Sequence, residues 1–113
     1  MVTVAAGRAA LPGTSGLAAV NAAIAALAQV LAVELAPRRI INVISPGMTE
    51  TDAYAWMEPK QREAMFAGAA SRLPAGRVGE PDDLADAILF ALSNRFLTGA
   101  IIDVDGGAHL ARG

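Results

Sequence analysis

The stretch RIINVISPG, residues 39–47, decides the fold class of this 113-residue chain. Four β-branched residues stand almost side by side and a Pro-Gly pair follows them, which predicts a buried strand that ends in a turn. The stretch GAIIDVDGG, residues 99–107, repeats this pattern and ends at Asp-Gly-Gly. Apolar strands of this kind are typical of a parallel sheet that helices cover on both faces. The two stretches therefore predict an α/β fold.

Helical segments lie around these strands. A long apolar segment, residues 17–36, precedes the first of them, and helices are expected at residues 59–70 and 81–93 between the two. The last of these begins with Pro-Asp-Asp, which suits a helix start, and it repeats apolar residues on one face: Leu84, Ala87, Ile88 and Ala91. We expect a further short strand at residues 2–5, followed by a turn at residues 12–16. The order predicts about three parallel strands with flanking helices, as in the second half of a doubly wound sheet.

Composition excludes several classes of protein. The net charge of −2 and the 18% of charged residues leave no excess of basic residues that would indicate binding to a nucleic acid. The chain has no cysteine and one histidine, so we expect no disulfide and no metal site. The N-terminus lacks the basic start of a secretory signal, which favours the cytoplasm.

The long helix at residues 17–36 is long enough to cross a membrane. Its composition argues against a membrane span, because alanine dominates and three polar residues interrupt it: Asn21, Gln29 and Glu34. A helix that is apolar on nearly every side is typically buried on several sides. We therefore expect no membrane partner, and we expect this helix to pack between the sheet and a neighbouring helix or subunit.

Four blocks of sequence together resemble the short-chain dehydrogenases/reductases, in the order and spacing of that family: LAVELAP (residues 31–37), INVISPGMTETD (41–52), RVGEPDDLADAILFALSN (77–94) and LTGAIIDVDGG (97–107). The resemblance spans nearly the whole chain and corresponds to the C-terminal half of the family fold. It implies that residues 1–113 form part of a Rossmann-like domain. It also implies NAD or NADP as cofactor, hydride transfer to or from a small carbonyl or alcohol substrate, and assembly as a homo-oligomer, a dimer or a tetramer.

The resemblance also assigns candidate binding residues. Pro46 and Gly47 match the turn beside the nicotinamide, and Thr51 matches a threonine whose hydroxyl contacts the cofactor. Taken alone, these residues would be typical of an ordinary turn at the end of a strand. The segment after Thr51 resembles the substrate lid of the family, with Tyr54 and Trp56 as candidates for contact with an apolar substrate. Met65 and Phe66 follow at helical spacing, which is more typical of a core.

The catalytic residues of the family are not found at their expected positions. Members carry a tyrosine and, one helical turn later, a lysine, and those positions hold Leu17 and Asn21 here. The serine of the family falls near residues 5–7, where no hydroxyl occurs. Leucine cannot transfer a proton, whereas the Asn21 amide can still bond to a ribose or to a backbone carbonyl. The catalytic residues are therefore unknown, with Tyr54 the nearest alternative acid.

Other polar residues fit structural roles. Asp103 and Asp105 alternate on a strand that enters a turn, and His109 stands near the chain end without the Gly-x-Ser-x-Gly motif of a hydrolase. No Gly-x-Gly-x-x-Gly motif follows a strand, so a pyrophosphate site is not expected in this chain. Three functions stay open. The protein is an oxidoreductase with altered acid-base chemistry, a non-catalytic relative that binds a nucleotide or serves assembly, or an inactive truncated product.

Overall fold

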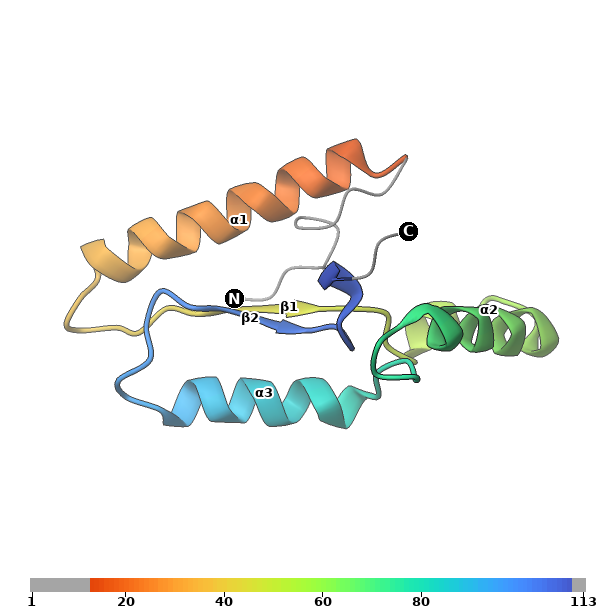
Figure 1. The fold of residues 1–113 in the computed structure, drawn as a ribbon. Helices are drawn as coiled ribbons and strands as arrows, with labels where there is room; N and C mark the ends of the chain where they lie inside the picture. The colour runs from red at the N-terminus through yellow and green to blue at the C-terminus, as the bar shows by residue number, and fades with distance from the viewer. Residues whose placement is uncertain (1–12, 111–113) are drawn as a thin grey trace.

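The computed structural model describes residues 13–110 of the chain. Figure 1 shows two strands flanked by helices. The elements in chain order are α1 (Ser15–Glu34), β1 (Val43–Pro46), the 3-10 turn η2 (Asp52–Tyr54), α2 (Pro59–Arg72), α3 (Pro81–Ser93), β2 (Ile101–Val104) and the 3-10 turn η3 (Ala108–Leu110). The strand expected at residues 2–5 lies outside the described residues. The α/β class and the parallel, Rossmann-like arrangement are confirmed.

β1 and β2 pair in parallel, in a register that runs from Val43 opposite Ile101 to Pro46 opposite Val104. β1 begins later than the apolar run suggested, because the residues before it bond to the loop that leads into β2. The Asn42 side chain donates to the carbonyl of Leu97 at 2.9 Å and accepts from the N–H of Ala100 at 3.1 Å. This buried amide fixes the register at the start of the sheet.

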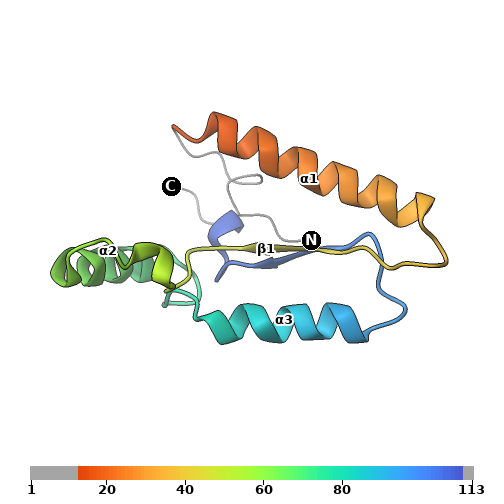
Figure 2. The same ribbon diagram turned by 180° about the vertical axis from the view of Figure 1, so that it is seen from behind.

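α1 and α3 lie on opposite faces of the sheet, as the two opposite views show (Figures 1 and 2). α3 has the expected bounds, and Glu80 and Asp83 mark its start, because the N–H of Glu80 donates to the Asp83 carboxylate at 2.8 Å. The apolar face expected from the sequence is half-buried or buried in α3: Leu84, Ala87, Ile88 and Ala91. The core between these layers contains Val43, Ile44 and three alanines, namely Ala28, Ala32 and Ala91. The carboxyl ends of both strands point toward α2.

α1 is covered on one side within the described chain. The buried residues of this helix are Asn21, Ala28 and Ala32, whereas the following apolar side chains are exposed: Leu17, Val20, Leu27, Val30 and Val33. The described chain thus covers one side of α1, and the packing of its other sides against a neighbouring helix or subunit stays a prediction. With a mean hydropathy of 2.0, α1 is long and apolar enough to cross a membrane by length and composition alone, a test that core helices also pass.

α2 begins at Pro59 as expected and ends at Arg72, two residues beyond the expected end. In both views it extends away from the sheet, beyond the carboxyl ends of the strands (Figures 1 and 2). Phe66 and Ala69 are its buried residues. Phe66 is thus a core residue of this region, as its helical spacing suggested.

Candidate functional site

The Pro46–Gly47 turn lies where β1 ends. The N–H of Gly47 donates to the carbonyl of Val104 at 3.0 Å, and the buried Thr49 hydroxyl donates to the carbonyl of Gly47 at 3.1 Å. A Cβ atom on Gly47 would lie 2.6 Å from the Cα of Asp105. A side chain cannot be accommodated there, so the turn requires glycine for close approach to β2.

A second set of bonds ties this turn to the segment before α3. The N–H of Gly79 donates to the carbonyl of Met48, and the N–H of Glu50 donates to the carbonyl of Gly79, both at 2.9 Å. Thr49 and Gly79 thereby form an isolated parallel bridge. Arg77, close to this bridge, makes two hydrogen bonds to the Asp83 carboxylate, at 2.8 and 2.9 Å. The segment is therefore held to the turn by backbone bonds and to α3 by a bidentate ion pair.

Thr51 is exposed at the start of η2. Its hydroxyl oxygen accepts the N–H of Ala53 at 3.3 Å, so its own proton can be donated to another group. Thr51 also borders a hollow of about 400 Å³, whose other lining residues are Glu50, Asp52, Ala55, Arg62 and Pro81. Pro46 thus ends β1, and Gly47 and Thr51 follow it on the connection to η2.

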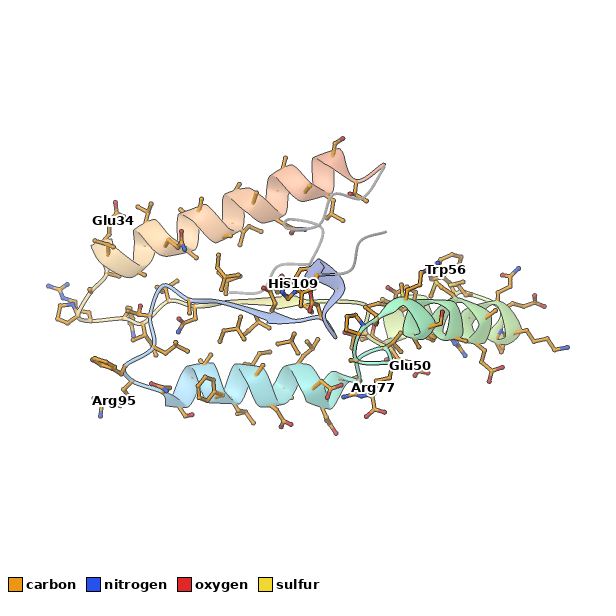
Figure 3. All side chains as sticks on the ribbon, in the orientation of Figure 1. Glu34, Glu50, Trp56, Arg77, Arg95 and His109 are labelled. Atoms are coloured by element: carbon orange, nitrogen blue, oxygen red, sulfur yellow. The ribbon has the colours of Figure 1, made fainter. Side chains whose placement is uncertain are left out.

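Tyr54 and Trp56 follow on the same loop but face different surroundings. The Tyr54 ring packs edge-on against Phe66 of α2, with ring centroids 5.3 Å apart. Trp56 is 81% exposed and lies beside α2 (Figure 3). Tyr54 therefore helps to attach α2 to the loop, whereas the Trp56 ring is available for contact with an apolar molecule.

Leu17 and Asn21 occupy consecutive turns of α1. Leu17 is half-exposed, while Asn21 is 5% exposed. The Nδ2 atom of Asn21 is buried and has no hydrogen-bond partner among residues 13–110. A buried donor without an acceptor costs roughly 1–3 kcal/mol, so Asn21 has an unmet requirement for an acceptor. Neither residue supplies a group that could act as a general acid.

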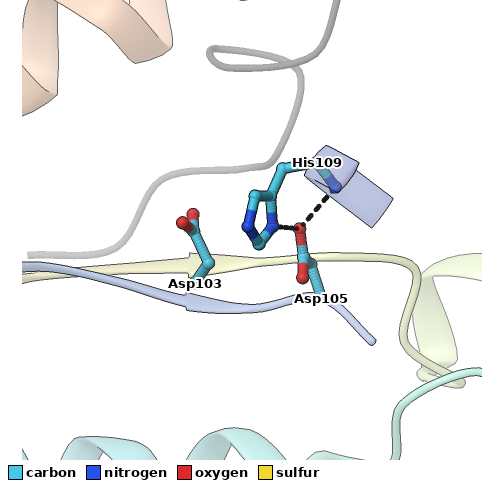
Figure 4. A group of neighbouring side chains, drawn as sticks. All are labelled: Asp103, Asp105 and His109. Carbon is cyan, nitrogen blue, oxygen red and sulfur yellow. Dashed lines mark hydrogen bonds and ion pairs between the residues drawn. The ribbon is translucent and has the colours of Figure 1, made fainter. Parts of the chain in front are cut away.

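Asp105 and His109 form a pair that the sequence analysis did not identify. The carboxylate of Asp105 accepts the N–H of Gly107 at 2.9 Å and that of His109 at 3.0 Å, and it lies 2.8 Å from the His109 Nδ1 (Figure 4). Burial on its own raises the pKa of Asp105, but the hydrogen bonds from the His109 ring and from the two N–H groups outweigh it and hold that pKa below its usual value. The only feature of the sequence that could have indicated this pair is the spacing of four residues between Asp105 and His109 across a turn.

Asp103 lies near this pair (Figure 4). One atom from each of Asp103, Asp105 and His109 that could bind a metal ion lies within 4.8 Å of the other two. Both carboxylate oxygens of Asp105 already accept N–H groups. These bonds account for the buried position of Asp105 as the centre of a turn, in agreement with the structural role expected from its sequence.

Comparisons with known proteins place this geometry in a family. Residues 1–109 match a family model described as enoyl-(acyl carrier protein) reductase. The chain is 38% identical over 99 residues to 3-oxoacyl-[acyl-carrier-protein] reductase FabG of Thermotoga maritima, covering 85% of this chain and 39% of that protein. It is 41% identical over 86 residues to L-xylulose reductase of Bos taurus, covering 72% of this chain and 34% of that protein.

Solved structures agree with these matches. A small-chain dehydrogenase in complex with NADPH superposes with a TM-score of 0.91 at 48% sequence identity, over 97% of this chain and 50% of that chain. A short chain dehydrogenase/reductase family protein superposes with a TM-score of 0.77 at 34% identity, over 97% of this chain and 44% of that chain. The chain thus spans half or less of the length of these relatives. With its parallel sheet, its Pro-Gly turn and these matches, the chain belongs to the short-chain dehydrogenase/reductase family.

Proposed function

We propose that the protein takes part in NAD(P)-dependent hydride transfer between the cofactor and a small carbonyl or alcohol substrate. The observation that carries this proposal is the loop of Pro46, Gly47 and Thr51 at the carboxyl end of a parallel strand in a chain of this family. Ligands of doubly wound folds bind outside the carboxyl ends of the strands. The reductases and the dehydrogenase among the relatives support the same reaction class.

The residues of this loop fit the nicotinamide side of such a cofactor. Gly47 has no room for a side chain, and the Thr51 hydroxyl has a proton to donate. Within residues 13–110, no strand is followed by a glycine-rich turn that opens an α-helix, which is the usual pyrophosphate site. The nicotinamide would supply or accept the hydride, while this chain would hold its carboxamide end. NAD and NADP are both compatible with these residues.

The substrate would approach from the side of α2. Trp56 offers an exposed aromatic ring, and the Tyr54 ring packs against Phe66 of α2. We assign Trp56 and Tyr54 to the substrate lid, with an apolar surface on the substrate opposite Trp56. Tyr54 is also the nearest phenol to the loop and is the first residue to test as an acid.

The partners and location follow from the same assignment. We propose a homo-oligomer, a dimer or a tetramer, that uses the exposed apolar face of α1, and a location in the cytoplasm. Residues 1–113 would form part of one Rossmann-like domain, and a glycine-rich half would complete the cofactor site.

The test uses a chimera in which the amino-terminal half of the Thermotoga maritima FabG precedes residue 1. We expect this chimera to bind NADH or NADPH, and Thr51→Val to weaken the affinity by roughly threefold to tenfold, the value of one hydrogen bond. Thr98→Val is the matched control, because Thr98 lies at the opposite end of the sheet and its hydroxyl accepts the N–H of Ile41. Equal affinity in the Thr51 and Thr98 variants would overturn the assignment of this loop.

A non-catalytic role in nucleotide binding or assembly is the second candidate function. Leu17 and Asn21 favour it because neither can serve in proton transfer.

The chimera with Ala6→Ser, Leu17→Tyr and Asn21→Lys separates the catalytic function from the non-catalytic one. General acid-base catalysis contributes roughly 100-fold to 10,000-fold, so a gain of that size in carbonyl reduction would show that the present residues lack an acid. If the unsubstituted chimera already reduces carbonyls and the triple variant is slower, another group, such as Tyr54, is the acid. Circular dichroism must first show that all variants fold.

A further inference from the structure

The turn after β2 is built around one carboxylate. Asp105 is 7% exposed, and its oxygens accept the N–H groups of Gly107 and His109 and face the His109 ring. Gly106 and Gly107 have φ values of 63° and 87°, in the left-handed region that favours glycine. The carboxylate therefore fixes a turn in which any residue other than glycine at positions 106 and 107 would be strained.

One side of this turn meets the Pro46–Gly47 turn. A Cβ atom added to Gly47 would lie 2.6 Å from the Cα of Asp105, and the neighbouring Val104 carbonyl accepts the N–H of Gly47 at 3.0 Å. The two backbones are in contact, without a side chain between them. Asp105 is therefore placed to hold Gly47 in position.

The other side of the turn meets the chain just after α2. The carbonyl of Gly106 accepts the N–H of Ala75 at 3.0 Å, and a Cβ on Gly107 would lie 2.8 Å from the ring of Pro74. Pro74 and Ala75 directly follow Leu73, the residue that caps the carboxyl end of α2. The turn thus holds the carboxyl end of the helix that extends away from the sheet (Figure 1).

We infer that Asp105 is a positioning residue, and that the turn it holds, residues 105–107, braces the Pro46–Gly47 turn and the carboxyl end of α2 against each other. His109 supports it, since its ring and its N–H both contact the carboxylate. The brace sets the distance between the loop assigned to the nicotinamide and the helix assigned to the substrate. This consequence for binding rests on the proposed function, whereas the brace itself rests on the contacts alone.

Amide hydrogen exchange in the 113-residue chain, measured by NMR, tests the brace. Asp105→Asn keeps one acceptor oxygen but places an amide donor opposite an N–H group. Because a hydrogen bond to a charged group contributes about 1.5–3 kcal/mol, we expect exchange at Ala75 and Gly47 to accelerate roughly tenfold or more. Exchange at Val43 in β1, whose N–H donates to the carbonyl of Ala100 at 2.9 Å, should stay unchanged, which separates a local release from global unfolding. Asp86→Asn makes the same chemical change on the exposed side of α3 and should alter none of these rates.

His109→Ala provides a milder variant, because it removes only the ring and keeps the backbone donor. We expect smaller accelerations at the same two amides, which keeps the test decisive if Asp105→Asn fails to fold. Unchanged rates at Ala75 and Gly47 in either folded variant would overturn the brace, even if exchange at Gly107 accelerates.

The same substitutions in the chimera separate the brace from the proposed function. If the brace positions the binding loop, Asp105→Asn should weaken NADPH binding, measured by calorimetry, while Asp86→Asn should not. Accelerated exchange with unchanged NADPH affinity would support the brace and count against Pro46–Gly47 as the cofactor loop. Unchanged exchange with intact NADPH binding would overturn the brace and leave the proposed function standing.

Discussion

Gly47 is the residue at which two loops come closest, because a Cβ atom there would meet the Asp105 backbone at 2.6 Å. We expect Gly47→Ala to destabilise the fold by roughly 1–3 kcal/mol, the usual cost of overpacking. Gly68→Ala is the matched control, since Gly68 lies inside α2 with no atom near the added methyl group, and it should stabilise the helix by about 0.5–1 kcal/mol. Urea unfolding of the two variants measures both effects. Equal midpoints for the two would contradict the close contact.

Asp83 carries a pH-dependent part of the stability. The hydrogen bonds from Arg77 and then from the N–H of Glu80 lower the pKa of Asp83 from 3.8 to about 2. A carboxylate with a lowered pKa contributes stability at pH values above its unfolded pKa and loses that contribution as the pH falls toward its folded value. We therefore expect stability to decline between pH 4 and pH 2, the range that this shift from 3.8 to about 2 defines.

Asp83→Asn should lower the urea midpoint at neutral pH and flatten its decline in this acid range. Asp82→Asn is the control, because Asp82 shares the first turn of α3 without the bond to Arg77. High salt should weaken the effect, since the pair is partly exposed. A profile for Asp83→Asn that still follows the unsubstituted chain would show that another carboxylate controls the acid transition.

At the scale of the element, α1 has more apolar surface than the sheet covers. Leu27 and Val30 are each more than half exposed, and exposed apolar surfaces of this kind are typical of interfaces. We expect the chain to self-associate, and Leu27→Lys with Val30→Lys to weaken association by roughly tenfold or more. Gln29→Lys adds a charge on the same helix without removing apolar surface, so it should have little effect.

Light scattering over a range of concentrations measures this association. A well-folded, non-aggregating monomer of the unsubstituted chain at high concentration would contradict the assignment of α1 as an interface.

At the scale of the whole molecule, the proposed function gives the described residues one side of a dinucleotide site. The loop of Gly47 and Thr51 is present, whereas a glycine-rich pyrophosphate turn is absent from residues 13–110. We expect the 113-residue chain alone to bind NADH and NADPH with a Kd above about 1 mM, equivalent to less than about 4 kcal/mol of binding free energy. Calorimetric titration measures this, and micromolar binding would show that the cofactor is held mainly by residues of this chain.

Much of the fold could be predicted from local sequence. The bounds of α3 are confirmed at both ends, because Pro81 and the acidic residues after it fix a helix start through neighbouring backbone groups. The bounds of β1 were less accurate, since Asn42 bonds to a loop 55 residues away. Among the candidate site residues, the sequence placed Pro46, Gly47 and Thr51 on one loop, and their role in binding stays a prediction.

The sequence by itself determined the α/β class and the parallel strands, because hydrophobic periodicity, capping and turn residues act between near neighbours in the chain. The family followed from the resemblance of four sequence blocks, and the family model confirms it. Only the tertiary structure decided that Gly47 meets Asp105, that Gly107 meets Pro74 and that Asn21, Ala28 and Ala32 are the buried residues of α1. These features join segments far apart in the chain. Such contacts depend on strand register and helix placement, which many residues determine together and no local pattern encodes.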